Sequence, residues 1–262
     1  MLRAVGTSVT VVLLGALGAD VGTAVYAEYH LARSVRSAAG LSFDPWVAIL
    51  GFPFLPQAAR HRYSELEIKA SGVDHPVAGK VTLEATMHGI GLRQASWLIG
   101  PDADLPLSKL ESRIIIDSRH VGSFIGVTDL TVEAPAADTN DATGGTTESG
   151  ISGSEGLVFT GTPRQAGFDK PVSVTVDLSI TGPERSTLVF TPTAVVTGPN
   201  TADQVVPDDK RDAVLAAFAA VMPGQVLPFG LTPTSQGARG SDIIVEGITG
   251  EVTVRLTGFN QS

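Results

Sequence analysis

The most distinctive chemistry of the chain lies in one short stretch, Gly-Phe-Pro-Phe-Leu-Pro-Gln, at residues 51–57. Its large apolar side chains are Phe52, Phe54 and Leu55. Two prolines restrict the backbone around them, which predicts a stiff, extended and irregular segment. Arg60 and Arg62 follow at once. Because apolar side chains hold hydrocarbon and guanidinium groups pair with phosphates, the pattern favours a ligand with acyl chains and an anionic headgroup.

A second apolar segment, Leu-Pro-Phe-Gly-Leu at residues 227–231, occurs late in the chain. Phe229 and Leu231 are its candidate contacts to an acyl chain. Two interpretations stay open for both segments. They line the entrance of an apolar site, or they are buried loops that close the ends of a sheet.

Composition excludes several classes of function. The formal net charge is -9, which argues against broad nucleic-acid binding. The chain has no cysteine, so disulfides, thiolate catalysis and cysteine-based zinc sites are excluded. The five histidines do not fall at metal-ligand spacing, and no nucleophile elbow, phosphate-binding loop or dinucleotide-binding motif occurs. We therefore predict no catalytic residue, no metal and no cofactor.

Residues 1–40 have the pattern of an export signal or a membrane anchor, because an uncharged and mostly apolar run covers residues 4–19. Cleavage after Ala27 is one interpretation. The other is an uncleaved anchor with Asp20 at the outer interface, and helical spacing that continues past Ala27 favours it. Either places residues 41–262 outside the cytoplasm. A third interpretation is a buried N-terminal helix of a cytosolic protein.

The remainder, residues 41–262, is predicted to be one β-rich domain. Apolar and polar residues alternate with a period of two in the segments 66–73, 81–86 and 172–181. We expect residues 188–196 to pair with the last of these through a turn at Gly182-Pro183. Residues 243–256 are expected to form a terminal hairpin. Antiparallel strands with one buried face predict a β-rich α+β fold.

One amphipathic helix is expected within this domain, over residues 207–222. An apolar stripe that includes Val214 and Phe218 runs along it. The stripe either packs in the core or, through Phe218, forms the wall of an apolar cavity. Residues 135–156 contain small and acidic residues and are expected to form a mobile loop insertion.

The stretch at residues 51–57 resembles a motif of the actinobacterial LmeA family of phospholipid-binding cell-envelope proteins, known from mycobacteria and their relatives. That family carries a similar GFPFLTQ stretch after an N-terminal signal or anchor helix, then strands and a late Leu-Pro-Phe segment. Here Pro56 stands at the usual threonine position, and the late segment is residues 227–229. The order of these features covers nearly the whole chain.

The resemblance implies a periplasmic protein, at the outer face of the plasma membrane, that binds phospholipids including phosphatidylinositol. It also implies a role in mannan elongation during lipomannan and lipoarabinomannan synthesis. The implied fold is like that of tubular lipid-binding proteins. In such a fold a curved antiparallel sheet wraps round a long amphipathic helix.

Our hypothesis from the sequence is a non-catalytic lipid-binding protein that contacts the membrane through its N-terminal segment. The predicted acyl contacts are Phe52, Phe54, Leu55, Phe218, Phe229 and Leu231. Arg60 and Arg62 are the predicted headgroup contacts. Two alternatives stay open: an envelope enzyme acting on lipoglycans, and a scaffold that recruits envelope synthases.

Overall fold

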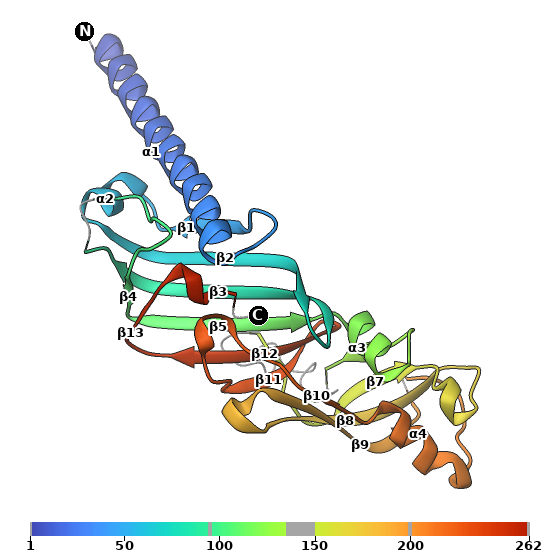
Figure 1. Ribbon diagram of the computed structural model, residues 1–262. Helices are drawn as coiled ribbons and strands as arrows, with labels where there is room; N and C mark the ends of the chain where they lie inside the picture. The colour runs from blue at the N-terminus through green and yellow to red at the C-terminus, as the bar shows by residue number, and fades with distance from the viewer. Residues whose placement is uncertain (1, 94–95, 135–149, 199–200, 261–262) are drawn as a thin grey trace. The chain divides into compact units, whose positions relative to one another are not determined.

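The computed structural model describes residues 2–93, 96–134, 150–198 and 201–260 (Figure 1). Its α-helices are α1 (Leu2–Ala38), α2 (Phe54–Ala59), α3 (Ser118–Ile125) and α4 (Arg211–Phe218). Its strands are β1 (Trp46–Leu50), β2 (Arg62–His75), β3 (Gly79–Gly91), β4 (Leu105–Leu107), β5 (Lys109–Ile116), β6 (Thr131–Glu133), β7 (Leu157–Gly161), β8 (Val172–Thr181), β9 (Thr187–Val196), β10 (Ala220–Met222), β11 (Ser235–Arg239), β12 (Asp242–Thr249) and β13 (Val252–Val254). The predicted β-rich fold is confirmed.

The strands form three sheets. One has the order β1-β2-β3-β5-β12-β11, the second the order β10-β9-β8-β7-β6, and the third pairs β13 with β4. The chain divides into two compact units. The first unit contains Met1–Ala70, Glu84–Glu111 and Thr249–Gln261, and the second contains Ser71–Leu83 and Ser112–Ile248. Strands β2, β3, β5 and β12 therefore contribute residues to both units.

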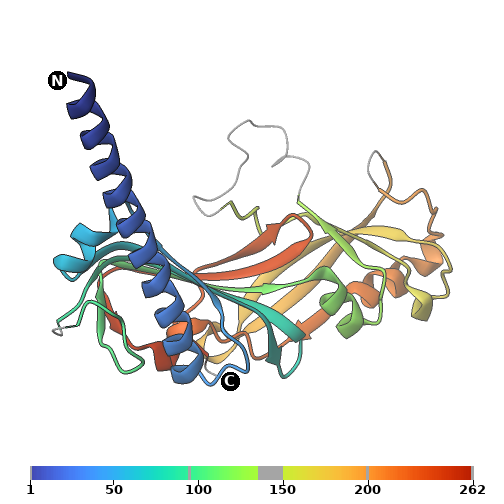
Figure 2. The same cartoon turned by 90° about the horizontal axis from the view of Figure 1, so that it is seen from above.

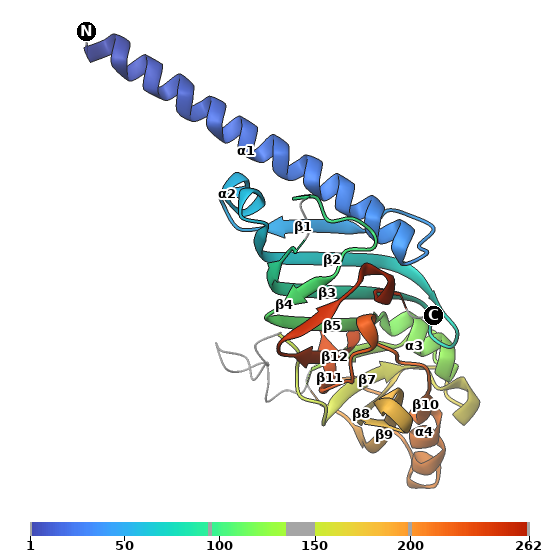
Figure 3. The same ribbon diagram turned by 60° about the vertical axis from the view of Figure 1, so that its left-hand side comes forward.

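In the first unit, α1 packs on the edge strand β1 (Figure 3). Ala27, Leu31 and Val35 recur at helical spacing and are buried. The Glu28 carboxylate accepts a hydrogen bond from the backbone N–H of Ile49 at 2.9 Å. Because an edge strand has unpaired backbone groups, this contact fixes the helix to the sheet.

Strand β2 follows the predicted alternation. Leu66, Ile68 and Ala70 are buried, and the residues between them point to the other face. On that face Lys69 forms an ion pair with Glu84 of β3 at 2.7 Å. The period of two thus separates an apolar core face from a polar outer face.

The second unit has β8 and β9 at the centre of its five-stranded sheet. They pair antiparallel from Ser173 with Val196 to Thr181 with Thr187, so the predicted hairpin and its turn are confirmed. The Phe159 and Phe190 rings lie 5.9 Å apart in an edge-to-face arrangement. These rings form part of the core beneath the sheet.

The predicted helix over residues 207–222 was wrong in length. A short 3-10 turn precedes α4, which ends at Phe218 after eight residues. Residues 220–222 instead form β10 and pair with β9. The open edge of β9 supplies backbone partners that override the helical propensity of the alanines. No long helix wrapped by a curved sheet is seen in the described part of this unit.

The predicted terminal hairpin is also replaced by another pairing. Strand β12 pairs with β11, from Asp242 with Arg239 to Glu246 with Ser235. Strand β13 pairs with β4 in a sheet of its own. A glycine-containing turn therefore joins two strands of different sheets.

Of the predicted loop insertion, residues 135–149 lie outside the described residues. Ile151 is fully buried and clusters with Ile115 and Ile244. Ser152 exchanges hydrogen bonds with the backbone of Ala238. The end of the predicted insertion thus packs onto the second unit.

Candidate functional site

The stretch at residues 51–57 folds into a tight turn followed by α2, which corrects the expectation of an extended segment throughout. Pro56 is the third residue of the helix. The first N–H groups of a helix have no intrahelical partner, so a proline is tolerated there. The Gln57 amide donates to the carbonyl of Gly51 at 2.5 Å and accepts from the N–H of Ser64 at 2.9 Å. Gln57 thus ties the turn to the start of β2.

Gly51 is required by this turn. Its φ of 104° lies in a region that side chains rarely adopt. A Cβ placed on Gly51 would stand 2.9 Å from the Gln57 amide nitrogen. The glycine and the glutamine of the motif therefore depend on each other.

Asp20 of α1 caps the start of α2. It is 6% exposed, and its carboxylate accepts hydrogen bonds from the N–H of Phe54 at 2.9 Å and of Leu55 at 2.7 Å. Carboxylates are the preferred partners of free N–H groups at a helix start. Sequence reasoning missed this role, because no local pattern links Asp20 to a helix that begins at residue 54.

The apolar residues of the motif divide into two sets. Phe54 is 2% exposed, and its ring stacks on Tyr63 and meets Trp97 edge to face. Phe52 is 71% exposed and Leu55 is 41% exposed. Phe54 therefore acts in packing, whereas Phe52 and Leu55 are accessible to a ligand.

Arg60 and Arg62 line one pocket of about 770 Å³ in the first unit. Arg93, two residues past the end of β3, lines it as well, and β4 and β13 complete the wall. Among the described residues neither Arg60 nor Arg62 forms an ion pair, and both side chains are exposed. Sequence reasoning missed Arg93, since only the fold brings it beside the predicted pair.

Tyr63 stands in the wall of the same pocket. Its hydroxyl donates a hydrogen bond to the carbonyl of Trp97. The side chain is buried, and this burial raises the pKa of the Tyr63 hydroxyl to about 12. Tyr63 therefore stays neutral and contributes no negative charge to the pocket.

The remaining predicted contacts lie in the second unit. Phe218 is fully buried on α4, which packs on β9. This burial agrees with the interpretation that the apolar stripe of the predicted helix packs in the core. Phe229 and Leu231 are half-buried around a 3-10 turn, Pro228–Gly230, in which Phe229 has a φ of 62°.

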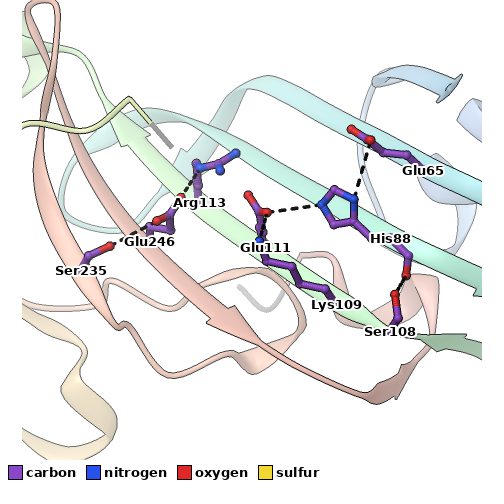
Figure 4. A network of polar contacts seen from close by, with 8 residues as sticks. All are labelled: Glu65, His88, Ser108, Lys109, Glu111, Arg113, Ser235 and Glu246. Atoms are coloured by element: carbon purple, nitrogen blue, oxygen red, sulfur yellow. Dashed lines mark hydrogen bonds and ion pairs between the residues drawn. The ribbon is translucent and has the colours of Figure 1, made fainter. Parts of the chain in front are cut away.

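Two polar clusters also lie on the strands, and Figure 4 shows their side chains. In the first unit, His88 lies 3.3 Å from Glu111 and 3.7 Å from Glu65, and Lys109 pairs with Glu111 at 2.9 Å. Sequence reasoning did not single out this cluster, whose members come from neighbouring strands. Across the described residues, no group of three or more His, Asp or Glu side chains is arranged to hold a metal ion.

In the second unit, the Arg113 guanidinium donates to the Glu246 carboxylate at 2.5 Å (Figure 4). The side chains are only 11% and 1% exposed. Ser235 lies 3.3 Å from the other carboxylate oxygen. This buried pair is structural and joins β5 to β12.

In the part of the chain described here, no helix is both long enough and apolar enough to cross a bilayer.

A β-rich body, an arginine-lined pocket and exposed apolar residues in the segment just before Arg60 suit a lipid-binding protein. The chain belongs to the LmeA-like phospholipid-binding family, whose model matches residues 18–248. This match confirms the resemblance indicated by the motif. No curated protein and no solved structure matches the chain at a significant level.

Proposed function

We propose that this protein is a non-catalytic carrier or sensor of anionic phospholipids in the cell envelope, with phosphatidylinositol as the leading ligand. Family membership establishes phospholipid binding as its class. The observation that carries the proposal is the pocket beside the motif, where Arg60, Arg62 and Arg93 gather. In a protein of net charge -9, three guanidinium groups against one carboxylate, Glu251, in the same pocket favour a phosphate.

Our proposed arrangement of the lipid follows from the chemistry of the arginine-lined pocket and of the exposed apolar side chains. The phosphodiester contacts Arg60, Arg62 and Arg93, and the inositol hydroxyls meet the polar groups of the wall. Phe52 and Leu55 contact the acyl chains near the mouth. Phe229 and Leu231 remain candidate acyl contacts in the second unit. Phe54, which is 2% exposed, supports α2 through packing, whereas Phe218, which is 0% exposed, packs in the core of the second unit.

We also propose a location and a role for the protein in the cell. We place the protein outside the cytoplasmic membrane, exported or anchored by its N-terminal segment, where it supports mannan elongation on lipomannan and lipoarabinomannan. A phosphatidylinositol-based lipid is the natural ligand for that role. The support for this step is the family match together with the apolar run at residues 4–19.

The test is vesicle binding by an Arg60→Ala/Arg62→Ala variant. We expect affinity for phosphatidylinositol-containing vesicles to fall about 5-fold for each arginine at low salt and less at high salt. The matched control is Arg185→Ala/Arg211→Ala, which removes the same charge in the second unit. Unchanged binding of the first variant at every salt concentration would contradict the headgroup assignment.

Native mass spectrometry separates the alternatives. We expect phospholipid to co-purify with the full chain. Turnover of a mannoside or a phosphoester by the purified chain would establish an enzyme instead. A stable protein partner without any bound lipid would establish a scaffold. The cellular role is tested by returning the double arginine variant to cells that lack the protein and measuring mannan chain length.

A further inference from the structure

A group of large apolar side chains stays exposed around α2 in the first unit. Phe52 is 71% exposed, Leu55 is 41% exposed, and Leu50 at the end of β1 is 39% exposed. Phe54, between Phe52 and Leu55 in the chain, is 2% exposed. The burial of Phe54 shows that the fold can cover a phenylalanine here, and it leaves Phe52 outside.

Helix α1 brings two more apolar side chains to this place. Leu17 is 45% exposed and Val21 is 56% exposed, and they lie one helical turn apart. Between them in the sequence is Asp20, whose carboxylate binds the N–H groups of Phe54 and Leu55. The contact fixes this part of α1 beside α2. We refer to Leu17, Val21, Leu50, Phe52 and Leu55 as the apolar tip.

The segment around α2 carries cationic side chains and no carboxylate, although Glu251 lines the pocket that Arg60 and Arg62 share. Residues 45–64 contain no aspartate or glutamate and include Arg60 and Arg62, although the whole chain is acidic. Asp20 is buried, and its carboxylate is satisfied by two backbone donors. An exposed apolar group beside exposed arginines matches a surface with hydrocarbon beneath a layer of phosphates.

The N-terminal part of α1 extends past α2 on the same side. Figure 3 shows α2 beside α1 at the end from which the helix projects, and Figure 2 shows the projecting helix from above. The sequence of this projecting part is uncharged and mostly apolar over residues 4–19. The apolar tip and the apolar run therefore reach toward one surface.

We propose that the apolar tip is a docking surface for a phospholipid bilayer. Phe52 and Leu55 insert among the acyl chains of the outer layer, and Arg60, Arg62 and Arg93 lie at the level of the phosphates. The inference goes beyond the binding of a single lipid molecule, because it describes how the protein sits on a membrane. In this docked orientation the arginine-lined pocket has direct access to lipid headgroups.

A single-site probe tests the insertion. The chain has no cysteine, so Phe52→Cys in the full chain carries one environment-sensitive fluorophore. Vesicles of phosphatidylcholine with phosphatidylinositol are expected to shift its emission to the blue, and a quencher on the acyl chain is expected to reduce it. The matched control is Val205→Cys, at a residue of the second unit that is 73% exposed and should show neither change. No change at residue 52 overturns the proposal.

Binding by unlabelled variants is the second test. Phe52→Ser should weaken vesicle binding by about 10- to 100-fold, because a buried phenylalanine is lost from the membrane. Val205→Ser should leave binding unchanged. Since Phe52 is mostly exposed, circular dichroism and the thermal midpoint should match the parent chain. A Phe52→Ser variant that keeps full vesicle affinity, or that instead loses self-association or a protein partner in the absence of vesicles, overturns the proposal.

A failure of bilayer docking can be distinguished from a failure of the proposed lipid-binding function. Binding of short-chain phosphatidylinositol below its micelle concentration reports on the pocket without a bilayer. Leu17 and Val21 belong to the apolar tip but lie outside the proposed contacts to a single lipid, so loss of vesicle binding by Leu17→Ser/Val21→Ser, with short-chain binding retained, supports docking by the tip. A parent chain that inserts residue 52 into vesicles but binds no short-chain lipid keeps the docking surface and contradicts the carrier function.

Discussion

Asp20 and Phe54 are 34 residues apart in the sequence, yet the carboxylate of the first accepts the backbone N–H of the second at 2.9 Å. The other carboxylate oxygen binds the N–H of Leu55 at 2.7 Å. One buried acid thus joins α1 to the start of α2, and α2 carries the exposed phenylalanine and leads into the arginines. The N-terminal helix is therefore part of the architecture of the site.

Replacing Asp20 with Asn should loosen α2. Asparagine has the same size, but it has one acceptor oxygen and no charge, so both N–H groups lose a charged partner and one of them also loses its acceptor. We expect the unfolding free energy to fall by about 1.5–3 kcal/mol, measured by chemical denaturation. Hydrogen exchange at the amides of Phe54 and Leu55 should accelerate most.

Asp44→Asn is the matched control for that change. Asp44 is exposed and pairs with Arg36 at 3.2 Å, and such surface pairs contribute about 0–1 kcal/mol. Equal effects of the two substitutions, or unchanged exchange at Phe54, would show that the Asp20 contact does not hold α2.

Truncation tests how much of α1 belongs to the folded protein. A variant lacking residues 1–14 keeps Asp20 and should retain the parent's denaturation midpoint. A variant lacking residues 1–27 loses Asp20 and the buried Ala27, so it should unfold at least as easily as the Asp20→Asn variant. Thermal scans followed by circular dichroism measure both.

This result bears on processing of the N-terminus. Removal of the chain up to Ala27 by a signal peptidase would leave α2 without its cap, so we expect the mature protein to retain Asp20. Equal midpoints for the two truncated variants would favour cleavage after Ala27.

The strands could be predicted because the alternation of apolar and polar residues indicates which side chains lie on the buried face of a sheet. Most of the apolar residues predicted to point inward from β8 and from the start of β9 are buried, and the turn at Gly182-Pro183 joins the two strands. Ile180 and Val196 are half-buried and Ala194 is exposed, so the prediction fails toward the ends of the hairpin. The end of α4 could not be predicted in this way. Ala220 and Met222 suit a helix locally, and only the free edge of β9 makes them a strand.

The site shows the same division between local and tertiary information. Arg60 and Arg62 stand out in the sequence, because they are close together in an acidic chain. Arg93 joins them only when the ends of β3, β4 and β13 come together. In the sequence, Asp20 looks like an acid at a membrane interface. Only the fold shows that its carboxylate binds the start of α2.

The buried pair of Arg113 and Glu246 is expected to be sensitive to loss of one member. Glu246→Gln removes the charge 2.5 Å from the Arg113 guanidinium, whose side chain is 11% exposed. Removing one member of a buried ion pair costs about 3–5 kcal/mol, so urea denaturation should show a loss of that size.

A double-mutant cycle checks the origin of that loss. Arg113→Met combined with Glu246→Met should cost less than the sum of the two single changes, since neither charge is then stranded. Lys80→Met, at the exposed pair with Asp74, should change stability by about 0–1 kcal/mol. Additive losses in the cycle would contradict a direct coupling.

Because the Tyr63 hydroxyl is buried, we expect the folded protein to lose stability at alkaline pH. Burial raises its pKa from the ordinary value of 10.0 to about 12, so the folded state favours the neutral phenol. The raised pKa contributes stability that is complete below pH 10 and is lost as the pH rises from 10 through about 12. Denaturation midpoints of the parent chain should therefore decline over this window.

The variant Tyr63→Phe isolates the effect, because it keeps the ring against Phe54 and removes the hydroxyl that donates to the Trp97 carbonyl. We expect it to cost about 1 kcal/mol at neutral pH. Subtracting its phenolate absorbance from that of the parent should leave one ionisation near pH 12. If the subtracted curve instead rose near pH 10, the Tyr63 hydroxyl would be accessible to water, and the wall of the arginine-lined pocket would be more open than its burial indicates.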